Sequence, residues 1–121
     1  MRRVCVVTGS RAEFGQTRWL LEEIRASESL ELDLVVTGSH LEERYGFTVD
    51  EIRAHGFDVS REVPLGLGQG DAKAIVSAVS RGVEGIGTAF ESLKPDVVIV
   101  FADRFEMLAA AQAAMFLNLP I

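Results

Sequence analysis

Residues 3 to 15 read Arg-Val-Cys-Val-Val-Thr-Gly-Ser-Arg-Ala-Glu-Phe-Gly, a short apolar run that ends at Gly9 and leads into a polar loop. Consecutive apolar, β-branched residues are typical of a strand that is buried on both faces. A helical pattern follows from about residue 16 to residue 26, and residues 32 to 37 repeat the strand pattern and end at Gly38. The order strand, loop, helix, strand predicts a unit with two parallel strands.

The periodicity of apolar residues predicts which helix faces are buried. The first helix is expected to bury Leu20, Leu21 and Ile24. Thr48 and Glu51 have the spacing of a capping box, which predicts a short helix up to about residue 55.

A longer helix is expected after Asp71, which stands where an N-cap would be. Its apolar residues recur at steps of three and four, namely Ile75, Val76, Val79, Val83, Ile86, Phe90 and Leu93. Gly82, Gly85 and Gly87 lie inside this helix, and each costs about 1 kcal/mol relative to Ala. We therefore expect close packing at these glycines, and a mobile loop at the glycine-rich residues 65 to 70.

Two further strands and a last helix complete the pattern. Residues 58 to 64 predict a weak strand, and residues 97 to 101 predict the strongest one. Residues 105 to 117 are apolar on nearly all sides of a helix and are expected to be buried, and residues 118 to 121 predict a turn into another strand. Strands that alternate with helices predict an α/β domain with a doubly wound, Rossmann-like parallel sheet covered on both faces.

The composition excludes several classes of function. The net charge is −6, and no basic cluster longer than Arg2-Arg3 occurs, so nucleic acid is not an expected partner. Cys5 is the only cysteine, which excludes an internal disulfide and a cysteine metal cluster. The most apolar stretch, residues 107 to 117, is shorter than the roughly 20 residues of a membrane span. The N-terminus has no signal-peptide pattern, so we expect no membrane association and a cytoplasmic protein.

Candidate binding residues follow the first two strands. In a parallel sheet ligands bind at the carboxyl ends of the strands. Arg11 lies there beside the N-terminus of a helix, which favours a phosphate, although a simple turn with a solvated Arg11 is the alternative. His40 follows the second strand at the same edge, and a structural hydrogen bond is the alternative to a role in the site.

The loop after the strongest strand carries Asp103, Arg104 and Glu106. An aspartate at the carboxyl end of a strand is well placed for proton transfer, and the other two side chains could modulate it. Asp103 and Glu106 also have the spacing of a capping box, so a structural role is an equal alternative. We assign no role to His55, at the end of a surface helix.

Together, several segments resemble one family, the hydrolysing UDP-N-acetylglucosamine 2-epimerases, in particular the branch that feeds sialic and legionaminic acid synthesis. The segments are Val7-Thr-Gly-Ser-Arg-Ala-Glu-Phe-Gly15, Arg18-Trp-Leu-Leu21, Val36-Thr-Gly-Ser-His-Leu41, Tyr45-Gly-Phe-Thr48, Lys94-Pro-Asp96 and Asp103-Arg-Phe-Glu-Met-Leu-Ala-Ala-Ala111. They occur in the family's order and spacing along nearly the whole chain.

The resemblance implies a two-domain, glycosyltransferase-B-type fold with two Rossmann-like domains that face each other across a cleft. Residues 1 to 121 would be an incomplete N-terminal domain, with the C-terminal nucleotide-binding domain and a second carboxylate cluster beyond residue 121. The implied reaction eliminates UDP from UDP-N-acetylglucosamine and adds water to the glycal, which yields N-acetylmannosamine. It uses no cofactor and no metal. We expect the chain alone to be inactive and the full-length enzyme to be a homo-oligomer.

The resemblance also implies roles for individual residues. Asp103 would be an acid/base carboxylate, and the substrate would be bound by Arg11 at its phosphates, by His40 on the sugar side, and by Arg104 and Glu106. The chain departs from the family at two positions. Ala102 stands where a glycine is usual, and Gln16 stands where some members have a lysine.

Three alternatives stay open. The substrate could be UDP-2,4-diacetamido-2,4,6-trideoxyglucose, with the same reaction. A glycosyltransferase of the same fold would transfer the sugar instead of eliminating UDP. A binding or regulatory module complete at this length is a non-enzymatic alternative, which is disfavoured because the apolar helix at residues 105 to 117 would lack its full cover.

Overall fold

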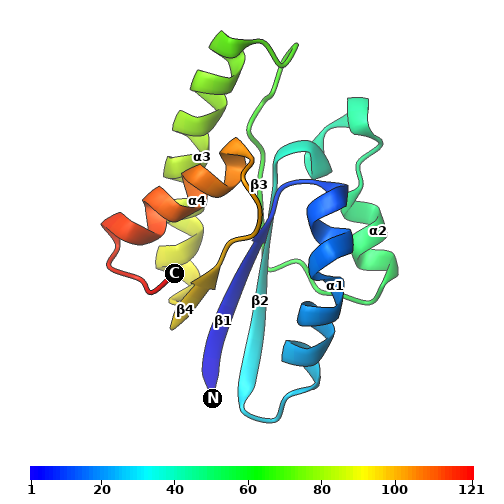
Figure 1. The fold of residues 1–121 in the computed structure, drawn as a ribbon, viewed down its shortest axis with the longest axis vertical. Helices are drawn as coiled ribbons and strands as arrows, with labels where there is room; N and C mark the ends of the chain where they lie inside the picture. The colour runs from blue at the N-terminus through cyan, green and yellow to red at the C-terminus, as the bar shows by residue number, and fades with distance from the viewer.

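The computed structural model describes all 121 residues and contains one parallel sheet of four strands (Figure 1). The strands are β1 (Arg2–Thr8), β2 (Leu30–Thr37), β3 (Arg61–Val63) and β4 (Val97–Ile99). Their order in the sheet is β3-β2-β1-β4, and every neighbouring pair is parallel. The predicted doubly wound α/β fold is confirmed.

Helices cover both faces of this sheet. The α-helices are α1 (Arg11–Ala26), α2 (Val49–Ala54), α3 (Ala72–Leu93) and α4 (Phe105–Phe116), and two short 3-10 helices follow β2, η1 (Gly38–Leu41) and η2 (Glu43–Tyr45). Figure 1 shows α1 and α2 on one side of the strands and α3 and α4 on the other. In β1, Val4 and Val6 pack in the core with α1 and α2, while Cys5 and Val7 pack in the core with α3 and α4. Alternate side chains of one apolar strand thus supply both cores.

Helix α1 begins earlier than the sequence predicted. Its N-cap is Ser10, whose hydroxyl accepts a hydrogen bond from the Glu13 N–H, so the predicted loop is the first turn of the helix. The prediction that Leu20 faces inward is wrong, because that side chain is exposed. The predicted burial of Leu21 and Ile24 is confirmed, and the buried face of α1 also includes Glu13, Phe14 and Thr17.

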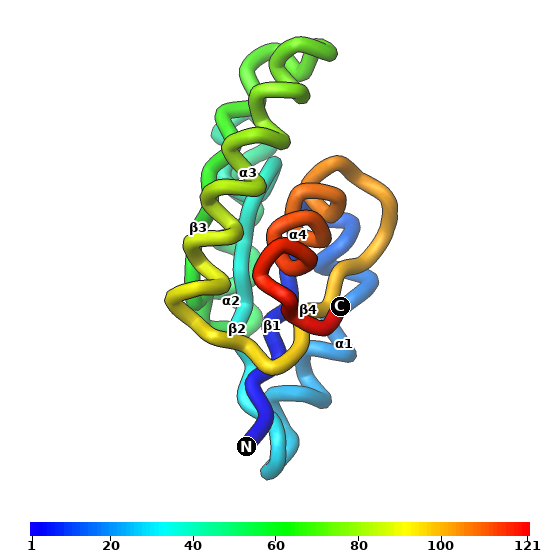
Figure 2. The backbone as a smooth tube through the Cα atoms, turned by 90° about the vertical axis from the view of Figure 1, so that its left-hand side faces the viewer, coloured from blue at the N-terminus to red at the C-terminus, as the bar shows by residue number.

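Helices α3 and α4 lie side by side, and α3 extends well past the carboxyl ends of the strands (Figures 1 and 2). Asp71 caps α3 as predicted, through a hydrogen bond from the Ala74 N–H at 2.8 Å. A Cβ atom added to Gly85 would lie 2.6 Å from Val63 Cγ1, and one added to Gly82 would lie 3.1 Å from Ala109 Cβ. The close packing expected at the interior glycines is confirmed at these two, against β3 and α4.

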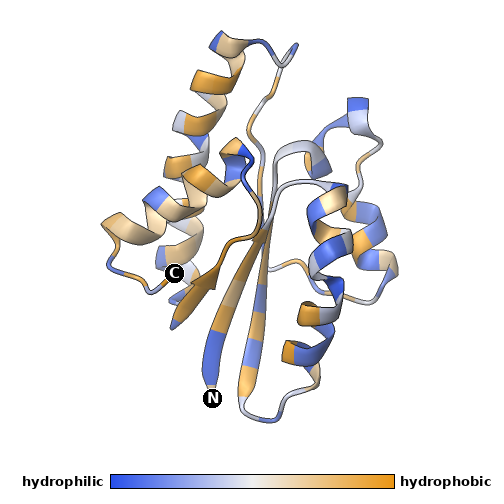
Figure 3. Ribbon diagram, in the orientation of Figure 1, coloured by the Kyte–Doolittle hydropathy of each residue, from blue (hydrophilic) through white to orange (hydrophobic).

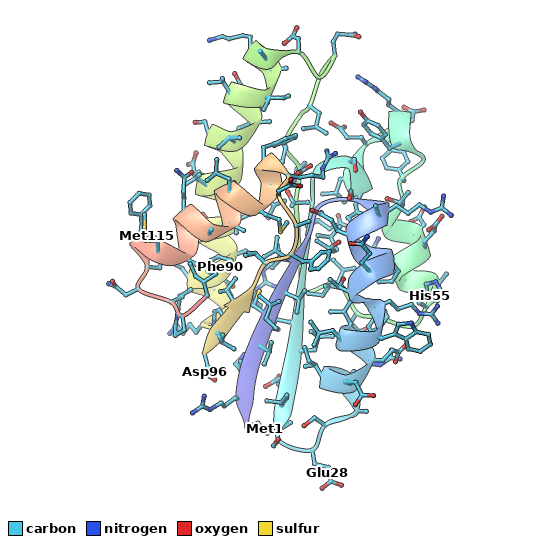
Figure 4. The ribbon with its side chains drawn as sticks, in the orientation of Figure 1. Met1, Glu28, His55, Phe90, Asp96 and Met115 are labelled. Carbon is cyan, nitrogen blue, oxygen red and sulfur yellow. The ribbon has the colours of Figure 1, made fainter.

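The prediction that α4 is buried on nearly all sides is wrong. Its small residues pack against α3 and the sheet, but Leu108, Met115 and Phe116 are exposed. Helix α4 lies in an outer layer and contacts the sheet and α3. It therefore buries one face, and the opposite face stays exposed even though its residues are apolar. Hydrophobic colour therefore reaches the outer side of α4 in Figure 3, and Met115 lies at the outer end of the helix in Figure 4. No helix combines the length and the apolar character needed to cross a membrane.

The glycine-rich residues 65 to 70 form side-chain hydrogen bonds with other elements, and their mobility stays a prediction. Arg81 donates to the carbonyls of Leu65 and Gly66, at 2.6 and 2.9 Å. From the other side, Arg44 donates to the Gly68 carbonyl and Glu42 accepts from the Leu67 N–H. These side-chain bonds come from elements distant in sequence, so local composition could not reveal them.

We predict opposite effects for two glycine substitutions in helices. Gly85→Ala should lower the free energy of unfolding by about 1–3 kcal/mol, because the added methyl group overlaps Val63. Gly15→Ala meets no atom within 4 Å and should raise it by up to about 1 kcal/mol through helix propensity. Urea unfolding of both variants measures the difference. Equal effects would show that helix propensity, and not packing against β3, decides the Gly85 position.

Candidate functional site

The candidate site is a hollow of about 490 Å³ at the carboxyl ends of the strands. Strand β1 has β2 on one side and β4 on the other, so the loops after β1 and β4 lead to helices on opposite faces of the sheet. Ligands of open α/β sheets bind at such a switch point. The hollow is lined by Ser10, Arg11 and Ala12 after β1, by Ser39, Tyr45, Gly46, Thr48 and Glu51 after β2, and by Arg104 after β4.

Arg11 lies in the first turn of α1, where free N–H groups and the helix dipole favour an anion. Its guanidinium forms an ion pair with Glu51 across the hollow, at 3.1 Å. Both side chains are exposed, at 73% and 46%, so the pair contributes at most about 1 kcal/mol. Arg11 is therefore free to exchange Glu51 for a more strongly charged partner.

Glu106 lies beneath the hollow and is completely buried. Its carboxylate accepts two hydrogen bonds from Arg104, at 3.1 Å each, and this pairing raises the pKa of the Arg104 guanidinium. The Arg104 side chain is 44% exposed and lines the hollow. Glu106 thus contributes to the hollow indirectly, by fixing the direction of Arg104.

Two glycines make room for Glu106. A Cβ atom on Gly9 would lie 3.0 Å from the Glu106 Cβ atom, and one on Gly38 would lie 2.7 Å from its Oε1 atom. Gly38 also has a φ of +64°, which other residues rarely adopt. Both glycines belong to a Thr-Gly-Ser sequence that follows a strand, at residues 8 to 10 and 37 to 39. The repeated tripeptide was the sequence signal for this packing.

The two Thr-Gly-Ser segments are bonded to each other. The Gly9 carbonyl accepts from the Ser39 N–H at 3.0 Å and from the Ser39 hydroxyl at 3.1 Å. Ser39 lines the hollow, so its place depends on the Gly9 peptide. The sequence analysis did not single out Ser39, Tyr45, Thr48 or Glu51 for the site, because only the folded chain brings them together with the residues that follow β1.

His40 lies behind the wall of the hollow and is completely buried. Its Nε2 atom is 3.0 Å from the Thr8 hydroxyl, and its Nδ1 atom is 2.8 Å from the hydroxyl of Thr48, which does line the hollow. Burial lowers the pKa of His40 to about 4. The ring is therefore neutral at pH 7, and it positions Thr48.

The capping box predicted at Thr48 and Glu51 is wrong. Thr48 has helical dihedral angles and caps nothing, because its hydroxyl binds His40. Glu51 pairs with Arg11 instead. A buried imidazole needs hydrogen-bond partners, and this requirement outweighs a local cap.

The capping box predicted at Asp103 and Glu106 is also wrong. The N-cap residue of α4 is Arg104, with no side-chain cap. The Asp103 side chain is exposed and takes part in none of the hydrogen bonds or ion pairs of the structure. It follows Ala102, which has a φ of +71°, so a non-glycine residue occupies a left-handed conformation there. Asp103 directly precedes Arg104 but does not itself line the hollow, and its carboxylate is free.

No group of three or more His, Cys, Asp and Glu side chains is placed to hold a metal ion. Cys5 is buried, and burial raises the pKa of its thiol to about 12. The chemical resources of the hollow are therefore two arginines, a helix N-terminus, hydroxyl groups and a neighbouring free carboxylate. This set suits an anionic ligand and proton transfer.

Comparison with known proteins identifies the family of the chain. The UDP-N-acetylglucosamine 2-epimerase family matches residues 22–121. The chain belongs to this family. It is 40% identical over all of its 121 residues to the UDP-N,N'-diacetylbacillosamine 2-epimerase (hydrolyzing) of Legionella pneumophila, and covers 32% of that protein. It is 33% identical to the UDP-N-acetylglucosamine 2-epimerase of Neisseria meningitidis, with 92% of the chain and 29% of that protein covered.

Solved structures show the same fold. The N. meningitidis UDP-GlcNAc 2-epimerase bound to UDP-GlcNAc superposes with a TM-score of 0.81 at 18% identity, over 98% of this chain and 30% of that one. The UDP complex of S. aureus MnaA gives 0.76 at 19% identity, over 100% and 28%. This chain therefore spans about a third of the length of the epimerases it matches.

We predict a loss of stability in mild acid that originates at His40. The pKa of His40 is about 4 in the folded protein and 6.5 in the unfolded chain, so the unfolded chain binds the proton more readily. The contribution of neutral His40 to the free energy of unfolding is therefore fully present above pH 6.5 and is lost as the pH falls toward 4. The loss should reach about 2 kcal/mol at pH 5 relative to pH 7.5. Urea unfolding at both pH values measures it, and His40→Gln should remove this part of the pH dependence. The same pH dependence in wild type and variant would contradict the assignment.

Proposed function

We propose that the protein to which this chain belongs is a cytoplasmic, hydrolysing 2-epimerase of UDP-linked 2-acetamido sugars. In the first step a base removes the proton at C2, the bond from C1 to the UDP oxygen breaks, and a glycal forms with release of UDP. In the second step water adds across the glycal double bond. The products are UDP and a free sugar with the opposite configuration at C2.

One observation carries this proposal, the convergence of Arg11, Arg104 and the N-terminus of α1 on a single hollow at the switch point of the sheet. The chain has a net charge of −6, so a diphosphate cannot be held by a general positive field. It must be held by placed cations and backbone N–H groups. The same groups stabilise the negative charge that develops on UDP as it leaves.

Asp103 is the proposed acid/base residue on this side of the cleft. The residue directly precedes Arg104 in the chain. Its carboxylate is exposed and has no hydrogen-bond or ion-pair partner. Proton transfer requires a group that can approach the sugar, and Glu106 is excluded from that task by its complete burial. In this proposal Glu106 acts on the substrate through Arg104, and His40 acts through Thr48.

The substrate sugar is either N-acetylglucosamine or the 2,4-diacetamido-2,4,6-trideoxy sugar. The names of two relatives favour the second sugar. The L. pneumophila relative at 40% identity is named a UDP-N,N'-diacetylbacillosamine 2-epimerase (hydrolyzing), and a Campylobacter jejuni relative at 33% identity is named a GDP/UDP-N,N'-diacetylbacillosamine 2-epimerase (hydrolyzing). Both candidates share the diphosphate, to which the two arginines of the hollow are suited, and both carry a 2-acetamido group. A second Rossmann-like domain and a homo-oligomeric assembly of the full-length enzyme belong to the same proposal.

We predict that Asp103→Asn in the full-length protein lowers turnover by at least about 10²-fold, because an amide cannot exchange a proton as a carboxylate does. UDP release and formation of the epimerised sugar are measured separately with each UDP-sugar. Loss of only the second would place Asp103 in the hydration step. The melting temperature and the UDP affinity should stay near wild type, since Asp103 has no structural partner.

Asp58→Asn is the matched control, because Asp58 is an exposed aspartate in a loop away from the hollow. It should leave turnover unchanged. Near-normal rates in Asp103→Asn would assign the acid/base work to other carboxylates. If the wild-type protein neither releases UDP nor epimerises either sugar, the proposed function is wrong.

A further inference from the structure

Glu13 is a buried carboxyl group that no part of the proposed chemistry uses. It lies in the first turn of α1 and is 4% exposed. Its Oε1 atom accepts a hydrogen bond from the buried Gly9 N–H at 2.9 Å, and its Oε2 atom is buried without a partner. A buried carboxyl group with one unsatisfied oxygen reduces stability, so its presence here calls for an explanation.

The Gly9 peptide connects Glu13 to the wall of the hollow. On its N–H side it is fixed by Glu13, and on its carbonyl side it accepts both bonds from Ser39. Its Cα is in close contact with Glu106, because an added Cβ atom would lie 3.0 to 3.1 Å from three Glu106 carbon atoms. Glu106 in turn holds Arg104. A displacement of Gly9 would therefore move two groups that line the hollow, Ser39 and Arg104.

We infer that Glu13 is a positioning residue for the reaction, which fixes the Gly9 peptide and through it the places of Ser39 and Arg104. This inference rests on the proposed function, because it assumes that Arg104 and Ser39 face the UDP-sugar. This role requires an acceptor oxygen on a side chain that is long enough to reach the Gly9 N–H. The negative charge is not required.

The surroundings of Glu13 agree with a role that needs no charge. Burial raises the pKa of Glu13, the Gly9 hydrogen bond opposes this rise, and the nearby Glu106 adds to it. A protonated carboxyl group keeps a carbonyl oxygen as an acceptor. The Gly9 bond therefore persists in either protonation state.

Two conservative substitutions in the full-length enzyme separate reach from charge. Glu13→Gln keeps the length and the acceptor but has no charge, and it should retain kcat within about threefold of wild type. Glu13→Asp keeps the acid but is one methylene group shorter, so it should not reach the Gly9 N–H. We expect kcat for UDP release to fall by roughly 10- to 100-fold, because a small displacement of Ser39 and Arg104 would misalign the substrate.

Glu23→Gln and Glu23→Asp are the matched controls, because Glu23 is exposed on the same helix. Both should behave as wild type. A normal Glu13→Asp enzyme, or a Glu13→Gln enzyme as impaired as Glu13→Asp, overturns the inference while an active wild type leaves the proposed function standing. A Glu13→Asp protein with a lower melting temperature but normal kcat would assign Glu13 to folding alone and also overturns it. A wild type without activity on either UDP-sugar would overturn the proposed function itself.

Discussion

The buried carboxylate of Glu106 constrains the whole carboxyl edge of the sheet. It occupies the space between the ends of β1 and β2, and Gly9 and Gly38 have no side chains there because a Cβ atom would overlap it. A charge at this depth needs a partner, and Arg104 supplies two hydrogen bonds. Without Arg104 the buried carboxylate would lose its only ion-pair partner, so the ion pair and the two glycines that make room for it depend on one another.

This constraint brings structure and site together. The loops after β1 and β2 are neighbours because these strands are paired, and Gly9 and Gly38 leave room for Glu106 while Ser39 bonds the Gly9 carbonyl. The N-terminus of α1 then opens on the same hollow as Arg104. In the proposed reaction these groups hold the diphosphate, and Asp103, one residue before Arg104, is left free for proton transfer.

Periodicity predicted most of the fold, since the apolar runs of β1 and β2 and the stepped pattern of α3 depend only on local sequence. It did not reveal which polar side chains bond to one another. Thr48 bonds His40 instead of capping a helix, and Glu106 bonds Arg104 instead of closing a capping box. Sequence reasoning found Arg11 and Arg104 in the hollow, placed His40 and Glu106 at its surface although both are buried, and missed Glu13. The sequence predicts where each strand ends. It does not predict which side chains of two neighbouring strand ends point into the hollow and which are buried.

The most direct measurement is a calorimetric titration of UDP into the full-length protein and its Arg11→Ala variant. Arg53→Ala is the control, because Arg53 also forms an exposed ion pair with a glutamate but lies away from the hollow. Loss of a charge-assisted contact to phosphate should weaken UDP binding by roughly 1.5–3 kcal/mol in Arg11→Ala. Arg53→Ala should bind as wild type, with the fold intact in both variants. Unchanged UDP affinity in Arg11→Ala would place the diphosphate elsewhere and contradict the account.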